Sequence, residues 1–475
     1  MRHKTRAFLI AASLLLVTAC NGNGLPVAPT NTPQLGSDSA ATPTAESVAS
    51  LPTATPRNQT RPTRTPRGTQ PTEEPTEVAT AEATEDVGPE PTSQAVDPDL
   101  DREVRQVEED TSTVRGLEPM GDVPETFLTQ PQMKSNLLRD ISEDYSQEEA
   151  DQDTMELWLL RLVDDRDLDL LKLQIDLLGE QVLGYYDPEM DEMYVLRNQS
   201  DLSPGSKQTL AHEFVHALQD QHFDLEKLLP DDSHDDDRSL AIRALVEGDA
   251  TIAGLSYVRD YFTQSDIQEF IEESSSADTS VLNSAPAYLR ESLYFPYDAG
   301  ADFVNELLAM DGFQAVDEAL ADPPASTEQI LHPDKYFDSP RDEPIQVPLP
   351  PLTDTLGAGW TMVDWGTLGE FDLRVILDEN GAADPEEAAA GWGGGSYAFY
   401  QNPDGDLGLM YTAIEWDNDN EADEYVEALE ETFDNATRTG DLYEQDDRFY
   451  SLTRSGKTVT LISSNDQAAV ESVAK

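Results

Sequence analysis

The 475-residue chain is poor in cysteine and in basic residues. Its only cysteine is Cys20, which excludes an intrachain disulfide and any zinc site built on cysteine pairs. Lys and Arg number 30 against 95 Asp and Glu, and the net charge is −65. Such a surface repels nucleic-acid phosphates, so it excludes a nucleic-acid-binding role. It suits an exterior rich in salt, where ions screen the self-repulsion of the chain.

The first twenty residues explain the lone cysteine. Three basic residues precede an apolar stretch at 8–17 that is too short to span a bilayer comfortably, and the stretch leads to Val-Thr-Ala-Cys at 17–20. This ending resembles a bacterial lipobox, in which the cysteine is lipidated and becomes the mature N-terminus. We therefore expect a lipoprotein signal peptide at 1–20 and a protein lipid-anchored through Cys20 on the extracytoplasmic side of the cell membrane. An ordinary signal peptide with an incidental cysteine is the alternative.

The composition then divides the chain. Residues 21–99 are rich in Pro, Thr, Ala and Ser, and segment 21–97 has no aromatic residue, which predicts a disordered stalk because too little surface can be buried to offset the ordering entropy. The body begins near residue 100, and a Pro-rich linker at 347–351 divides it. We expect an α+β protein, with one domain at 100–345 and a second, small α+β sandwich at 353–475.

Apolar periodicity predicts the elements of both domains. In the first domain we expect helices at 101–114, 133–145, 154–163, 169–178 and 239–262, and a hairpin of two short strands at 181–188 and 192–196. In the second we expect helices on one face of a sheet, with helices at 367–379, 421–433 and 467–473 and strands at 396–400, 408–416, 448–453 and 457–463. The Gly-rich segment 391–395 is interpreted as a tight turn and, less favourably, as a binding loop.

The chemistry of the chain centres on His212, Glu213 and His216, which form an H-E-x-x-H motif. Ser203 and Pro204 are a typical start of the helix that carries it. Residues four apart share one face of a helix, so both imidazoles can reach one ion, and Glu213 beside them can take a proton from a water on that ion. The pattern predicts a zinc site; a buried helix whose histidines merely pack is the alternative.

A hydrolytic zinc site needs a third protein ligand, and three residues are candidates. Glu247 is favoured, because a carboxylate from a second helix completes a His2Glu set. His222 stands where a longer motif places a third histidine, but Gln219 replaces the glycine that would turn the chain out of the helix. Asp249 is the third candidate, although it more readily orients a ligand imidazole from behind.

These segments resemble a known family. The string from His212 to His216 followed by Glu-Gly-Asp at 247–249 resembles gluzincin-type zinc metallopeptidases, and the longer strings at 210–225 and 244–251 resemble uncharacterised zincin-like surface lipoproteins of bacteria and haloarchaea. The resemblance covers about 182–337. It implies a zincin-like catalytic domain, with a small twisted sheet over an active-site helix. The chain departs from the thermolysin-like pattern at Thr251, where that pattern has Asp, which leaves the substrate class open.

Two further segments are candidates for catalytic roles. Aromatics at 293–297 precede a predicted helix, and Tyr297 or Tyr294 is expected to donate a hydrogen bond to the developing oxyanion; aromatic core packing is the alternative. The string at 327–333 recurs in the similar zincin-like proteins, and this resemblance implies that His332 stabilises the transition state. A histidine that caps a helix end is the alternative for His332.

The sequence therefore predicts a membrane-anchored extracellular zinc metallopeptidase that acts on peptides or proteins, with Glu213 as the general base. The alternative is a non-enzymatic surface binding or adhesion lipoprotein on a zincin scaffold. A solute-binding lipoprotein is a weaker third interpretation, because no two similar lobes are visible.

Overall fold

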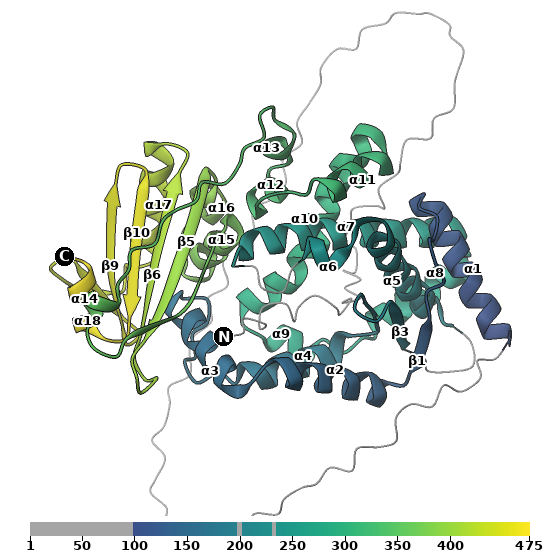
Figure 1. Cartoon of the computed structure of the whole chain (residues 1–475), viewed down its shortest axis with the longest axis horizontal. Helices are drawn as coiled ribbons and strands as arrows, with labels where there is room; N and C mark the ends of the chain where they lie inside the picture. The colour runs from purple at the N-terminus through teal and green to yellow at the C-terminus, as the bar shows by residue number, and fades with distance from the viewer. Residues whose placement is uncertain (1–97, 197–201, 230–233) are drawn as a thin grey trace, which may run out of the picture. The chain divides into compact units, whose positions relative to one another are not determined.

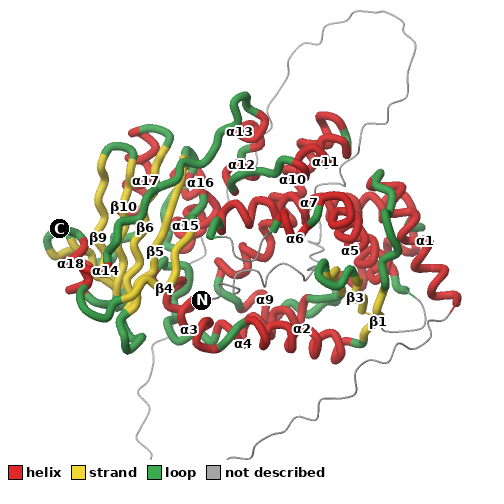
Figure 2. Tube along the Cα trace, viewed as in Figure 1, coloured by secondary structure: helices red, strands yellow, loops and turns green. Residues whose placement is uncertain are grey.

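The computed structural model describes residues 98–196, 202–229 and 234–475 (Figure 1). The predicted signal peptide, Cys20 and nearly all of the predicted stalk lie outside the described residues. The protein is α+β with two sheets, as predicted, and Figure 2 separates strands from helices by colour. No helix in the described ranges has both the length and the apolar character that crossing a membrane requires.

The first part of the body is mostly helical around a three-stranded sheet. The strands are β1 (Glu125–Leu128), β2 (Gly184–Asp187) and β3 (Glu192–Leu196), in the order β1-β3-β2. The antiparallel β2–β3 hairpin confirms the prediction, whereas β1, which pairs in parallel with β3, was not predicted because four residues carry too little periodicity. Four helices accompany the sheet: α1 (Pro98–Arg115), α2 (Gln130–Asp144), α3 (Gln147–Leu159) and α4 (Leu170–Gln181).

Two long helices form the centre of this part. Helix α5 (Pro204–Phe223) begins as predicted: the Ser203 side chain accepts a hydrogen bond from the amide of Ser206, and proline occupies the first turn. Helix α7 (Asp236–Tyr261) begins at Asp235, whose side chain accepts from the amide of Arg238. The remaining helices here are α6 (Leu225–Leu228), α8 (Gln264–Ser275), α9 (Ser280–Ser284), α10 (Ala287–Asp311), α11 (Phe313–Ala321), α12 (Thr327–Leu331) and α13 (Pro333–Phe337).

Helix α10 differs from the prediction. The aromatics at 293–297 do not precede the helix but lie inside it, and Pro296 is within its span. The helix crosses α7 at two glycines: a Cβ on Gly300 would lie 2.0 Å from the backbone oxygen of Ala244, and a Cβ on Gly248 would lie 2.3 Å from the backbone of Gly300. This contact between backbones holds α10 against α7 one turn after a proline that, by local propensity alone, favours a helix boundary.

The second part is built on a seven-stranded antiparallel sheet in the order β4-β5-β6-β10-β9-β8-β7. The predicted strands and hairpin are present: 408–416 coincides with β6, 396–400 and 448–453 lie within longer strands, and 457–463 is shifted by one residue from β10. Strands β4, β7 and β8 were not predicted. The Gly-rich segment is not a tight turn: only Gly391 has a positive φ, of 79°, and β5 begins at the next residue with a bulge. The elements are α14 (Thr353–Leu356), β4 (Thr361–Gly366), α15 (Glu370–Glu379), α16 (Pro385–Ala389), β5 (Trp392–Gln401), β6 (Gly408–Trp416), α17 (Asp419–Glu431), β7 (Thr437–Thr439), β8 (Leu442–Gln445), β9 (Arg448–Ser455), β10 (Thr458–Ser464) and α18 (Gln467–Val473).

Helices cover both faces of this sheet, not one face as predicted. Phe399 of β5 belongs to the core that includes residues of α15, α16 and α17, whereas its neighbour Tyr400 packs with Val470 of α18. Successive side chains point to opposite faces, so a strand that is apolar at consecutive positions is buried on both.

One hydrophobic core extends from the helical part into the seven-stranded-sheet part. It contains Trp158 of α3 together with Phe399 and Trp416 of the sheet. The buried Arg161 adds a polar contact, because one of its guanidinium nitrogens donates to the hydroxyl of Thr432 over 2.5 Å. The two parts on either side of the predicted linker at 347–351 therefore share one hydrophobic core.

Candidate metal centre

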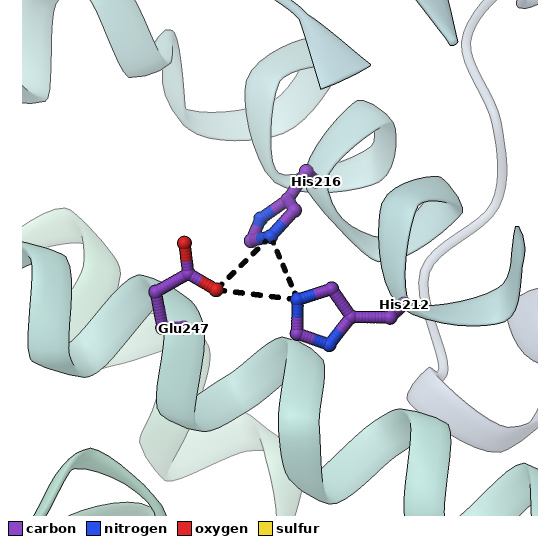
Figure 3. A group of neighbouring side chains, drawn as sticks. All are labelled: His212, His216 and Glu247. Atoms are coloured by element: carbon purple, nitrogen blue, oxygen red, sulfur yellow. Dashed lines mark hydrogen bonds and ion pairs between the residues drawn. The ribbon is translucent and has the colours of Figure 1, made fainter. Parts of the chain in front are cut away.

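Three potential ligand atoms converge between α5 and α7 (Figure 3). The Nε2 atoms of His212 and His216 are 3.1 Å apart, and Glu247 Oε2 lies 3.2 Å from His212 Nε2 and 3.4 Å from His216 Nε2. The three residues are buried, with 5%, 7% and 5% of their surfaces exposed. The structure thus brings together the two histidines of the motif and the favoured third candidate.

The spacing of these atoms fits a small divalent ion. Ligand bonds of 2.0–2.1 Å in tetrahedral geometry place neighbouring donor atoms about 3.3 Å apart. The observed separations of 3.1–3.4 Å agree with that value. Calcium, by contrast, takes only oxygen ligands at longer distances. The donor set therefore suits an ion that accepts imidazole nitrogen and carboxylate oxygen together.

The charges of the cluster show what competes with a metal. Burial by itself lowers the pKa of His216, but the Glu247 carboxylate outweighs this effect and raises the pKa to about 9. Burial by itself raises the pKa of Glu247, but the two imidazoles outweigh it and lower that pKa. In the metal-free protein a proton therefore occupies the cluster at neutral pH, and a metal has to displace it.

Gln219 fixes the orientation of the His216 ring. Its Nε2 donates to the backbone oxygen of Val246 over 2.9 Å and to Asp249 Oδ2 over 2.8 Å, so its Oε1 is the atom that faces His216 Nδ1 at 2.8 Å. Because that oxygen can only accept, Nδ1 carries the proton and donates, and Nε2 is the nitrogen available to a metal. From the sequence, Gln219 was considered only as the residue that replaces a glycine, and its role in orienting His216 was not predicted.

Asp249 contacts Gln219, which in turn contacts the ligand His216. Through Gln219 it orients the His216 imidazole instead of contacting the ring itself. On its other side, Asp249 pairs with the fully buried Arg115 of α1 at 2.7 Å, and Arg115 also pairs with Asp317 at 2.6 Å. Arg115 lies 134 residues before Asp249, and no local pattern in the sequence indicates this contact.

Glu213 is the most deeply buried residue of the motif, with 1% of its surface exposed. It lies toward β2: a Cβ on Gly184 would be 3.5 Å from Glu213 Cγ and 2.8 Å from Thr209 Cγ2. A larger residue at 184 would press on both side chains. The glycine in the predicted hairpin thus leaves room for the carboxylate arm.

Of the two candidate tyrosines, Tyr297 is the one beside the cluster. Its ring stacks on the His212 imidazole with ring centroids 6.2 Å apart, and it is half-buried. Tyr294, three residues earlier on α10, packs instead with Leu177 and Leu282. The crossing of α10 over α7 thus selects which tyrosine approaches the ligands.

The other two predicted histidines have partners elsewhere. His222 Nε2 lies 2.8 Å from the backbone oxygen of Glu118, in an exposed position. His332 Nε2 lies 2.9 Å from Glu370 Oε1 at the start of α15, and this hydrogen bond, opposed by burial, raises the pKa of His332. His332 therefore contacts α15 of the seven-stranded-sheet part and does not lie at the three ligand atoms.

A second acidic group, Glu328, Asp342 and Asp417, contains its own counter-ion. The ammonium of Lys335 lies 2.5 Å, 3.2 Å and 3.1 Å from these three carboxylates. Because Lys335 pairs with all three carboxylates, this group is an ion-pair cluster that links α12 to the seven-stranded-sheet part.

Comparison with known proteins gives one finding. A family model described as "Domain of unknown function (DUF8575)" matches residues 360–474, which is the seven-stranded sheet with its helices. No curated protein and no solved structure matched the chain. The matched segment does not include His212, His216 or Glu247.

Proposed function

We propose that this protein is a zinc metallopeptidase with a zincin-like catalytic domain, anchored to the outer side of the cell membrane through Cys20. The observation that carries the proposal is the convergence of His212, His216 and Glu247 at ligand spacing, with Glu213 next to a ligand and outside the ligand set. The helix pair with the small sheet beside α5 agrees with the fold that the sequence resemblance implies.

The catalytic roles follow from the placement of the side chains. Zinc held by the three ligands would lower the pKa of a water molecule and polarise a carbonyl group. With zinc bound, Glu213 would act as the general base toward that water and would carry the proton to the nitrogen of the leaving amine. Tyr297, whose ring stacks on His212, would donate its phenol hydroxyl to the developing oxyanion.

The neighbouring strand supports a peptide as substrate. Strand β2 is an edge strand of the three-stranded sheet, and its Gly184 lies against Glu213. An extended peptide that pairs with a sheet edge forms main-chain hydrogen bonds along its length. A peptide aligned on β2 in this way would lie along the strand whose Gly184 contacts the general base.

The test is the Glu213→Gln variant of the full-length chain. It keeps the size of the side chain but removes the base, so we expect bound zinc to stay and hydrolysis of a peptide library to fall by about 10²–10⁴-fold or more. Glu226→Gln, an exposed position on α6, is the matched control and should behave as wild type. A Glu213→Gln variant that hydrolyses as fast as wild type contradicts the assignment of the base.

Deep burial of the cluster favours a second candidate, a surface protein in which the metal is structural. Closed structural sites stabilise folding without chemistry. Under this proposal zinc raises the unfolding temperature, no peptide is hydrolysed by the wild type, and Glu213→Gln changes neither property. Zinc content, unfolding temperature and hydrolysis measured on the same preparations therefore separate the two functions.

A further inference from the structure

Arg243 is a buried cation next to the metal centre. It lies on α7 one turn before Glu247 and has only 9% of its surface exposed. Its Nε has no hydrogen-bond partner in the part of the chain that the structure describes. The buried Arg115, Arg161 and Arg448 also each have one nitrogen without a partner, but they donate through their other nitrogens: Arg115 to Asp249 and Asp317, Arg161 to Thr432, and Arg448 to the backbone oxygen of Trp158.

The charged groups around Arg243 show where it faces. Burial lowers the pKa of Arg243, opposed in decreasing order by Glu247, Tyr297 and Asp236. The first two belong to the metal centre or lie beside it. Asp236 lies two turns earlier on α7, and the hydroxyl of Tyr397 donates a hydrogen bond to its Oδ2 over 3.1 Å.

Metal binding reduces the negative charge that compensates Arg243. When Glu247 coordinates a divalent ion, its single negative charge is shared between the ion and Arg243, so Arg243 keeps less compensating charge than in the metal-free protein. A desolvated guanidinium that makes no hydrogen bond to a carboxylate is costly, and its planar donors match a carboxylate in two-point geometry. The rest of the chain is strongly acidic, with a net charge of −65, which makes a buried cation at this centre distinctive.

We propose that Arg243 receives a carboxylate of the substrate, held next to the zinc-bound peptide bond. The proposal rests on the proposed function and names its substrate class: peptides with a carboxylate close to the cleavage point. That carboxylate is either the free C-terminus or an Asp or Glu side chain, and the two sources present the same chemistry to the guanidinium.

The experiment measures binding, without turnover. The full-length, zinc-loaded Glu213→Gln chain is titrated by calorimetry with two pairs of peptides: N-acetyl-Phe-Leu against its C-terminal amide, and N-acetyl-Phe-Glu-amide against N-acetyl-Phe-Gln-amide. A charge-assisted contact makes the carboxylate member of one pair bind about ten- to a hundred-fold more tightly. The pair that shows this preference identifies the source of the carboxylate.

Three added substitutions test the residue. Arg243→Ala should abolish the preference, and Arg243→Lys, which keeps the charge but loses the planar donors, should retain part of it. Arg259→Ala is the matched control on the same helix, because Arg259 is half-exposed and paired with Asp260, and it should retain the full preference. Thermal unfolding of each variant shows whether it folds, and Arg243→Gln replaces Arg243→Ala if the alanine variant does not.

Several results overturn the proposal: equal binding within both pairs, no binding of any of the four peptides, or a preference that survives the loss of the Arg243 charge. The wild-type hydrolysis assay is read separately. A carboxylate preference without any hydrolysis means that the metallopeptidase proposal fails while the Arg243 subsite stands, and hydrolysis without a preference means the reverse.

Discussion

Replacing Gln219 tests whether the residues behind the ligands set the affinity for zinc. Gln219→Ala removes three buried hydrogen bonds, of 2.8 Å to His216, 2.9 Å to Val246 and 2.8 Å to Asp249. At about 1 kcal/mol net for each bond, the free energy of unfolding should fall by about 3 kcal/mol. The His216 ring also loses the acceptor that holds its Nδ1 proton, so zinc affinity should fall about 10–100-fold.

The measurements are zinc competition with a chromophoric chelator and chemical unfolding of the metal-free protein. Gln221→Ala, on the same helix but partly exposed, is the control for zinc affinity and should keep it, although it loses the hydrogen bonds that Gln221 makes with Met120 and Gly121. Gln219→Glu is a sharper variant: it keeps an acceptor for His216 but places a second carboxylate against Asp249, so it should destabilise the fold at neutral pH. Unchanged zinc affinity in Gln219→Ala would refute the reasoning that this side chain orients the ligand.

Three further predictions concern the ligands and the packing that holds them. Glu247→Ala should lose most zinc binding in an equilibrium dialysis assay, whereas His222→Ala should keep it. The opposite result would mean that His222, and not Glu247, is the third ligand. In the metal-free protein the pKa of His216 is raised to about 9, above its unfolded value of about 6.5. Zinc binding at pH 7 should therefore release a proton, and zinc affinity should increase with pH up to about pH 9. Over the same increase in pH, the metal-free protein should lose stability. Calorimetry in buffers of different ionisation enthalpy measures the number of protons released. Gly300→Ala should lower the unfolding free energy by on the order of 3 kcal/mol, because its Cβ would lie 2.0 Å from a backbone oxygen of α7, whereas Gly121→Ala, with open space around it, should not.

The second part shows where local patterns suffice and where they fail. Strand β6 and the hairpin of β9 and β10 were predicted because alternation and turn residues are local properties. The faces covered by helices were predicted wrongly, because whether α18 packs on the same face as α15 depends on contacts between segments about 90 residues apart. Strands β4, β7 and β8 depend likewise on neighbours that pair with them.

What the sequence by itself determined is the local chemistry. Helical spacing places His212 and His216 on one face and Glu213 beside them, Ser203 begins the helix, and the two strands before it form a hairpin, since each depends on residues within one or two turns. The tertiary structure decided which distant residues complete the site. It brought Glu247 to the imidazoles, placed Gln219, Asp249 and Arg115 in series behind His216, chose Tyr297 over Tyr294, and engaged His332 with Glu370. The arrangement around the ligands depends on the crossings of α7 with α1, α5 and α10 and of α1 with α5. Burial and close backbone contact determine these crossings, and no spacing along the chain encodes them.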